Sequence, residues 1–200
     1  MISPAAGWSA LHHGLDPSGN RLLRSWLRFV WLLARPLARA RIPPLVLTLA
    51  GLVLAVDAAL FAARLPWVAL GLVLLSVVCD GLDGAVAVLT SSASAFGSVA
   101  DKVADRVSDC AFAAVLWRCG APWWLALAAG ALSLVHEGVR AVVGGARLSR
   151  LTVAERPTRT VCAVLACGSA GVTSATWPAT VCAGVWVGLA VVGLGQVIRA

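Results

Sequence analysis

The chain has 200 residues, of which 60% are hydrophobic and only 12% charged, and its formal net charge is +7. Its mean hydropathy of +0.90 lies far above that of water-soluble domains, so the composition excludes a soluble globular protein and indicates an integral membrane protein. This length accommodates about six membrane spans of roughly 20 residues each with short connections, and leaves no room for a second domain.

The first 20 residues contain no apolar run of the length that a signal peptide needs, and we expect a flexible tail there. In residues 21–41 the arginines are three, four, seven and four positions apart, so on a helix they form one cationic stripe (Arg21, Arg24, Arg28, Arg35 and Arg39). The apolar residues fall largely on other faces. This pattern predicts a basic amphipathic helix in the headgroup layer against anionic lipid; a topogenic basic cluster is the alternative.

Six apolar runs follow, at residues 44–63, 66–90, 95–118, 122–144, 160–176 and 178–197, with prolines near their boundaries. The predicted fold class is therefore all-α: a polytopic membrane bundle of about six transmembrane helices over residues 42–200, preceded by the amphipathic helix. Most arginines lie on one side of these spans, against Arg64 and Arg118 on the other, which predicts that both termini are cytoplasmic. The six cysteines match no zinc pattern, and we interpret them as packing residues.

Four aspartates gather where the second and third spans meet the cytoplasmic side. Asp80 and Asp83 are three residues apart and Asp101 and Asp105 four, so each pair projects from one helical face. Four ionised carboxylates close together in a bundle repel one another unless they share cations. Ligation by oxygen alone, without His or Cys, favours hard ions such as magnesium, manganese or calcium.

The same four acids also fit two alternative roles. They could form internal ion pairs with Lys102, Arg106 and Arg140, or serve as a relay in a small divalent-cation transporter. A transporter needs polar residues along a path through the membrane, whereas these acids lie at one depth.

The segment from Asp80 to Asp105 resembles the signature of the CDP-alcohol phosphatidyltransferases, D-x2-D-G-x2-A-R-x8-G-x3-D-x3-D. Every spacing is kept in the matching residues, which are Asp80, Asp83, Gly84, Ala87, Gly97, Asp101 and Asp105. Pro44, Thr48 and Gly51 are similar to the family's P-N-x-[LV]-T segment, with Leu45 where Asn is usual. Together with the span layout, the resemblance covers roughly residues 21–200.

The resemblance implies an enzyme of phospholipid biosynthesis that moves a phosphatidyl-type group from a CDP-linked lipid, such as CDP-diacylglycerol, to a hydroxyl acceptor and releases CMP. It implies that Asp80, Asp83, Asp101 and Asp105 hold two ions of Mg²⁺ or Mn²⁺, and that Asp105 also takes the proton of the acceptor hydroxyl. The residues expected to contact the CDP donor are Thr48, Gly84, Ala87, Ser94, Gly97 and Arg106.

Val88 departs from the signature, which has an arginine at this position, and so removes a fixed cation from the expected phosphate site. Three interpretations follow. Arg106 or Lys102 substitutes from the third span, the donor differs, or the chain is a catalytically weakened relative that acts as a membrane scaffold.

Arginines near the cytoplasmic ends of the fourth and fifth spans suit a phosphorylated acceptor, and the predicted acceptor residues are Arg140, Arg147, Arg156 and Arg159. The positive-inside rule alone also accounts for them. The acceptor alcohol itself, whether inositol phosphate, glycerol phosphate, serine or another, is left open. We further expect a homodimer in the cell membrane whose active site faces the cytoplasm, and no nucleic-acid partner.

Overall fold

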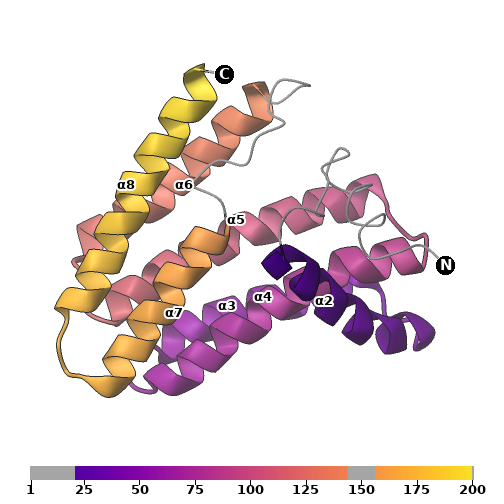
Figure 1. Ribbon diagram of the computed structural model, residues 1–200, viewed down its shortest axis with the longest axis horizontal. Coiled ribbons are helices and arrows are strands. Elements are labelled where there is room, and N and C mark those ends of the chain that lie inside the picture. The colour runs from indigo at the N-terminus through magenta and orange to yellow at the C-terminus, as the bar shows by residue number, and fades with distance from the viewer. Residues whose placement is uncertain (1–20, 144–155, 200) are drawn as a thin grey trace. The chain divides into compact units, whose positions relative to one another are not determined.

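The computed structural model describes residues 21–143 and 156–199, and it is entirely helical over these residues apart from short turns (Figure 1). The helices are α2 (Arg21–Arg39), α3 (Pro44–Phe61), α4 (Pro66–Leu89), α5 (Ala95–Arg118), α6 (Trp123–Val143), α7 (Arg156–Val172) and α8 (Trp177–Arg199). The predicted all-α class is confirmed, and each helix after α2 falls on one of the predicted apolar runs. The expected tail over residues 1–20 lies outside the described residues.

Four of these helices are long and apolar enough to cross a membrane, namely α3, α4, α6 and α8. The other two predicted spans are more polar or shorter. Helix α5 carries five charged residues within the stretch from Asp101 to Asp109, and α7 has only 17 residues and begins with an arginine. The chain is thus a membrane protein, whereas six as the number of spans stays a prediction.

The chain folds as two compact units, one within Met1–Gly51 and Ser76–Ala104 and the other within Leu52–Leu75 and Asp105–Ala200. Helices α3, α4 and α5 each continue from one unit into the other. The first unit therefore holds α2 with the signature segment up to Ala104. The second holds α6, α7 and α8.

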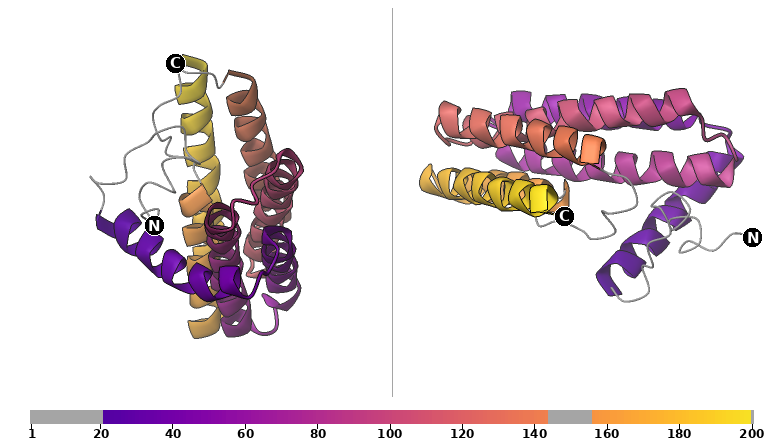
Figure 2. Two further views of the ribbon diagram at one scale, coloured as in Figure 1. Left: turned by 90° about the vertical axis from the view of Figure 1, so that its right-hand side faces the viewer. Right: turned by 90° about the horizontal axis from the view of Figure 1, so that it is seen from above.

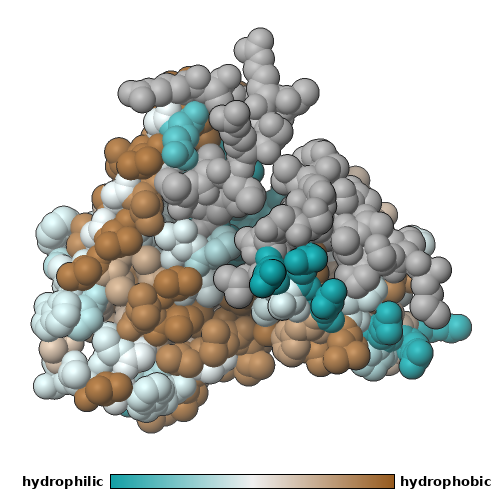
Figure 3. Space-filling model, viewed as in Figure 1, coloured by the Kyte–Doolittle hydropathy of each residue, from teal (hydrophilic) through white to brown (hydrophobic). Residues whose placement is uncertain are grey.

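The core of the first unit joins α2 to α3 and α4. Its buried residues are Val30, Trp31 and Ala34 from α2, Leu47 from α3, and Leu82, Ala85 and Val86 from α4. All five arginines of the α2 stripe are exposed, and hydrophilic residues lie over this helix in Figure 3. The predicted amphipathic helix is therefore present, and part of its apolar face is buried in the protein.

The turn between α4 and α5 connects the two halves of the signature. Ser91 adopts a left-handed conformation with φ of 51° and lets the Ser92 N–H reach the carbonyl of Ala87 at 3.0 Å, which ends α4. Ser94 then accepts a hydrogen bond from the Gly97 N–H at 3.0 Å and caps the start of α5. Hydrogen bonds at both helix ends thus fix the reversal of the chain.

In the second unit α8 contacts both α6 and α7, and Figure 2 shows α8 beside α6. A buried hydrogen-bond chain links two of these helices, because the Trp186 indole N–H donates to Ser133 Oγ at 2.8 Å and Ser133 donates to the Ala129 carbonyl at 2.9 Å. Cys119, Cys162 and Cys167 are buried and all six cysteines are free thiols, as expected of packing residues.

Candidate active site

The first half of the signature lies on α4, where Asp83 is buried and bound by a residue of α3. The Thr48 hydroxyl donates to Asp83 Oδ2 at 2.6 Å, and the exposed fractions of the two side chains are 8% and 6%. A buried carboxylate needs such a partner because its desolvation is costly. We expected Thr48 to contact the CDP donor. Its hydroxyl is instead hydrogen-bonded to Asp83, one of the predicted metal ligands.

The second half of the signature brings acidic oxygens close to Asp80. A carboxylate oxygen of Asp101, on α5, lies within 4.8 Å of one of Asp80. Asp105 follows one turn later on the same helix, and its carboxylate is within the same distance of that of Asp101. All three side chains are half-buried.

This donor set fits a hard divalent cation. Carboxylates at such distances repel one another, and a cation bound between them removes the repulsion. Magnesium and manganese prefer oxygen ligands of this kind. Asp80, Asp101 and Asp105 are three of the four predicted ligands, while the fourth, Asp83, is hydrogen-bonded to Thr48; the individual metal roles stay predictions.

Four of the six predicted donor contacts lie along α4 and around the start of α5. Gly84 and Ala87 are half-buried, three residues apart on α4. Ser94 uses its hydroxyl to cap α5 at Gly97. Val88 packs at the edge of the core that joins α2, α3 and α4, so the position of the signature arginine is occupied by an apolar contact.

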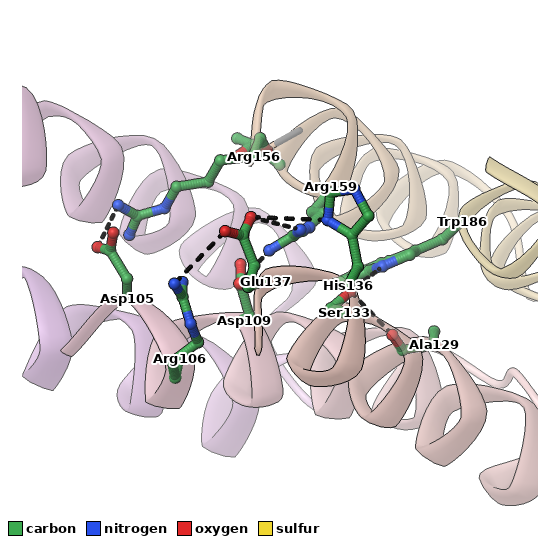
Figure 4. Close-up of polar contacts among 11 residues, drawn as sticks. Asp105, Arg106, Asp109, Ala129, Ser133, His136, Glu137, Arg156, Arg159 and Trp186 are labelled. Atoms are coloured by element: carbon green, nitrogen blue, oxygen red, sulfur yellow. Dashed lines mark hydrogen bonds and ion pairs between the residues drawn. The ribbon is translucent and has the colours of Figure 1, made fainter. Parts of the chain in front are cut away.

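A second polar cluster joins α5, α6 and α7 within the second unit (Figure 4). Arg156 forms an ion pair with Asp105, and Arg159, one turn later on α7, forms one with Asp109, one turn later on α5. Glu137 of α6 accepts hydrogen bonds from Arg159 at 3.0 Å and from Arg106 at 3.4 Å. Three arginines and three carboxylates therefore balance one another here.

Burial divides this cluster. Arg159 and Asp109 are 2% and 1% exposed, whereas Arg156 and Asp105 are 23% and 22% exposed. One oxygen of Asp109, Oδ1, has no hydrogen-bond partner among the described residues. The Arg159 pair is thus a buried structural contact, and the Arg156 pair lies at the accessible end of the cluster.

Reasoning from the sequence missed Asp109 and its pairing, although the signal was present. Asp101, Asp105 and Asp109 are each four residues apart, so they lie along one face of α5. Arg156 and Arg159 are three residues apart and so lie along one face of α7, where they can pair with two of these acids. His136 is fully buried, and its Nδ1 lies 3.9 Å from Glu137 Oε1.

The predicted acceptor arginines are distributed over two helices. Arg140 is half-buried near the end of α6, and Arg156 and Arg159 belong to the first turn of α7. Arg147 lies outside the described residues. Arg106, predicted to contact the donor, is paired with Glu137.

A model of the CDP-alcohol phosphatidyltransferase family matches residues 41–194. No curated protein sequence matches the chain. Two solved structures of phosphatidylinositol phosphate synthase (PgsA1) from Mycobacterium tuberculosis are similar to it, each at 26% identity. The one in complex with manganese and citrate has a TM-score of 0.71 over 85% of this chain and 87% of that chain. The one with CDP-DAG bound has a TM-score of 0.67 over 86% and 91%.

The family match extends over most of the chain and includes the whole signature from Asp80 to Asp105. The similar structures belong to a membrane enzyme of phospholipid synthesis and agree with the helical architecture of this chain. The chain belongs to the CDP-alcohol phosphatidyltransferase family.

Proposed function

We propose that this enzyme transfers the phosphatidyl group of a CDP-diacylglycerol-type lipid to the hydroxyl of a small alcohol that itself carries a phosphate, with release of CMP. One observation carries the choice of acceptor: Arg156 forms an ion pair with Asp105, the residue expected to take the acceptor's proton. The aspartates alone would repel an anionic acceptor. A guanidinium beside that carboxylate gives the anion a positively charged partner.

The similar structures support both substrates. One of them holds CDP-DAG, which favours a CDP-linked lipid as donor for this chain. Their enzyme is a phosphatidylinositol phosphate synthase, and its product carries a phosphate on the headgroup, which favours a phosphorylated acceptor. Inositol phosphate and glycerol phosphate are both compatible with an arginine at the site.

Asp80, Asp83, Asp101 and Asp105 would hold Mg²⁺ or Mn²⁺, which supplies positive charge to stabilise the diphosphate and the leaving CMP. Thr48 keeps Asp83 in one orientation. Asp105 accepts the proton as the acceptor oxygen forms its bond to phosphorus and the bond between phosphorus and CMP breaks. Arg156 binds the acceptor phosphate and thereby places the hydroxyl near Asp105.

Arg159 has a different part in this proposal. Its side chain is buried between Asp109 and Glu137, so it fixes the first turn of α7 from which Arg156 extends. Among the predicted acceptor residues, Arg156 is therefore our choice for direct contact with the phosphate.

We also propose that both termini and the active site face the cytoplasm, and that the enzyme is a homodimer. The face that we propose for the dimer is the exposed apolar stripe of α5 (Phe96, Val99, Val103 and Val107). Native Cys110 is also exposed on α5, so the test uses a Cys110→Ala background. There, disulfide cross-linking of Val103→Cys, compared with the exposed Val185→Cys on α8, would distinguish a dimer through α5 from a monomer.

The acceptor assignment is tested by giving the purified enzyme CDP-diacylglycerol, Mg²⁺ and alcohols with and without phosphate, and identifying the lipid product by mass. Arg156→Ala should raise the KM of the phosphorylated acceptor about ten-fold or more, the value of a charge-assisted contact, and leave the KM of the donor unchanged. Arg39→Ala, an exposed arginine of α2, is the control. A neutral alcohol as the better acceptor, or a wild-type KM in Arg156→Ala, would refute the proposal.

A further inference from the structure

Two close approaches of the backbone flank Asp80 on α4. Gly81 follows Asp80, and a Cβ atom placed on it would lie 3.2 Å from Val30 Cγ2 and 3.4 Å from Trp26 Cζ2, both on α2. Cys79 precedes Asp80, and a Cβ placed on Gly51 of α3 would lie 3.2 Å from its Cβ. Helices α2 and α3 therefore both pack closely against α4 at the two residues next to Asp80, the first acid of the signature.

The two contacts differ in kind. On the α3 side a hydrogen bond of 2.7 Å from Ser76 Oγ to the Gly51 carbonyl reinforces the packing. On the α2 side the contact is apolar, and it continues into the buried core of the first unit through Val30 and Leu82. The position of α2 on α4 thus depends on how closely Val30 can approach Gly81.

Helix α2 presents this contact on the side opposite to its arginines. At about 100° per residue, Trp26 and Val30 lie about 40° apart around the helix and far from Arg24, Arg28 and Arg35. Those arginines are exposed, and Val30 is buried. The two faces of α2 can therefore be altered independently.

We propose that α2 positions Asp80 for the divalent cation, with Gly81 and Val30 as the positioning residues. This inference rests on the proposed metal site at Asp80 and Asp101. A Cβ at position 81 would require Val30 and the middle of α2 to give way by a few tenths of an ångström, or α4 to tilt, and either movement shifts the neighbouring Asp80 carboxylate relative to Asp101. Metal ligands respond strongly to such displacement because their neighbours fix their orientation.

The test compares two Gly→Ala substitutions on α4. Gly81→Ala should weaken Mn²⁺ binding, measured by electron paramagnetic resonance of the free ion without substrates, by about ten-fold or more. Gly71→Ala is the matched control, since no atom lies within 4 Å of its added Cβ. Both substitutions raise helix propensity equally, so a difference in Mn²⁺ affinity between the two variants comes from packing.

A compensating substitution tests the geometry. Val30→Ala removes both methyl groups that the new Cβ would meet, so Gly81→Ala combined with Val30→Ala should recover Mn²⁺ affinity to within about three-fold of wild type. Val30→Ala alone opens a gap beside Gly81 and should weaken Mn²⁺ binding by a few-fold, which keeps the inference testable if Gly81→Ala fails to fold. Arg28→Gln, on the opposite face of α2, should bind Mn²⁺ like wild type.

Two outcomes overturn the inference: Gly81→Ala that binds Mn²⁺ like Gly71→Ala, or a double variant as weak as Gly81→Ala. Either result leaves the proposed function intact. Failure of the proposed metal site has another signature, because wild type and Gly71→Ala would then bind no Mn²⁺ at all.

Discussion

Thr48 on α3 donates a hydrogen bond of 2.6 Å to Asp83 on α4, and both side chains are buried. The bond connects the Pro44–Thr48 segment, which opens the first span, to the first half of the signature. It gives this threonine a physical role at the site, since it fixes one of the carboxylates in a buried position. The same contact supplies a test of how much the orientation of Asp83 matters.

Thr48→Val keeps the shape of the side chain and removes the hydroxyl, which leaves Asp83 buried without this donor. We expect CMP release to fall about ten-fold or more, because a hydrogen bond to a charged group contributes roughly 1.5–3 kcal/mol. Thr48→Ser keeps the hydroxyl and should retain most activity. Equal rates in the Val and Ser variants would show that the hydroxyl is dispensable.

Removal of the metal should abolish transfer. Asp80→Asn and Asp101→Asn each take a charged ligand from the acidic group, and we expect activity to fall below about 1% of wild type, as it should in EDTA, with the folded bundle retained. Asp57→Asn is the control, because Asp57 is half-buried in α3 and belongs to no acidic group among the described residues. Undiminished CMP release in EDTA or in either variant would refute the metal assignment.

The sequence contained enough to predict the helices, the basic face of α2 and the acidic group, because helical spacing is local and the signature keeps Asp80 through Asp105 within 26 positions. Contacts between distant segments were not predictable in this way. Arg159 and Asp109 are 50 residues apart, and nothing in either segment alone indicates that the two stripes face each other. The burial of Arg159, which separates it from Arg156, also depends on packing that local patterns do not encode.

Arg156 and Arg159 should therefore respond differently to substitution, although the sequence grouped them together. Arg159→Ala leaves Asp109 as a buried charge without its main partner, which costs about 3–5 kcal/mol, so we expect a large fall in thermal stability in detergent. Arg156→Ala removes a more accessible pair and should lower stability by about 1 kcal/mol or less. Thermal unfolding followed by thiol-reactive dye gives the comparison.

Asp109→Asn combined with Arg159→Gln is the control for that experiment, since it replaces the buried ion pair by two neutral amides. It should be more stable than Arg159→Ala because no buried charge remains at position 109. Similar stabilities for Arg156→Ala and Arg159→Ala would contradict the structural role of the buried pair.

Val88 offers the last prediction, because an apolar side chain stands where the family signature has arginine. Val88 packs against the core of α2, α3 and α4, but it is half-buried and belongs to the last turn of α4. An arginine there can keep its stem on the apolar cluster and extend its charge outward, and the helix C-terminus favours a cation. Val88→Arg should thus fold and bind CDP-lipid about ten-fold more tightly, the value of a contact with phosphate.

The matched control is Val88→Gln, which has a long polar side chain without charge, and the measurement is the Kd of CDP-diacylglycerol by competition in lipid nanodiscs. Arg106→Ala in the wild-type background shows whether that residue has taken over the missing arginine's role, and we expect it to weaken donor binding several-fold. The pairing of Arg106 with Glu137 holds the guanidinium beside α6, from which it would have to reach the donor phosphates. If Val88→Arg and Val88→Gln bind the donor equally and Arg106→Ala has no effect, then neither position supplies a phosphate contact. The hypothesis that Arg106 replaces the signature arginine would then be wrong.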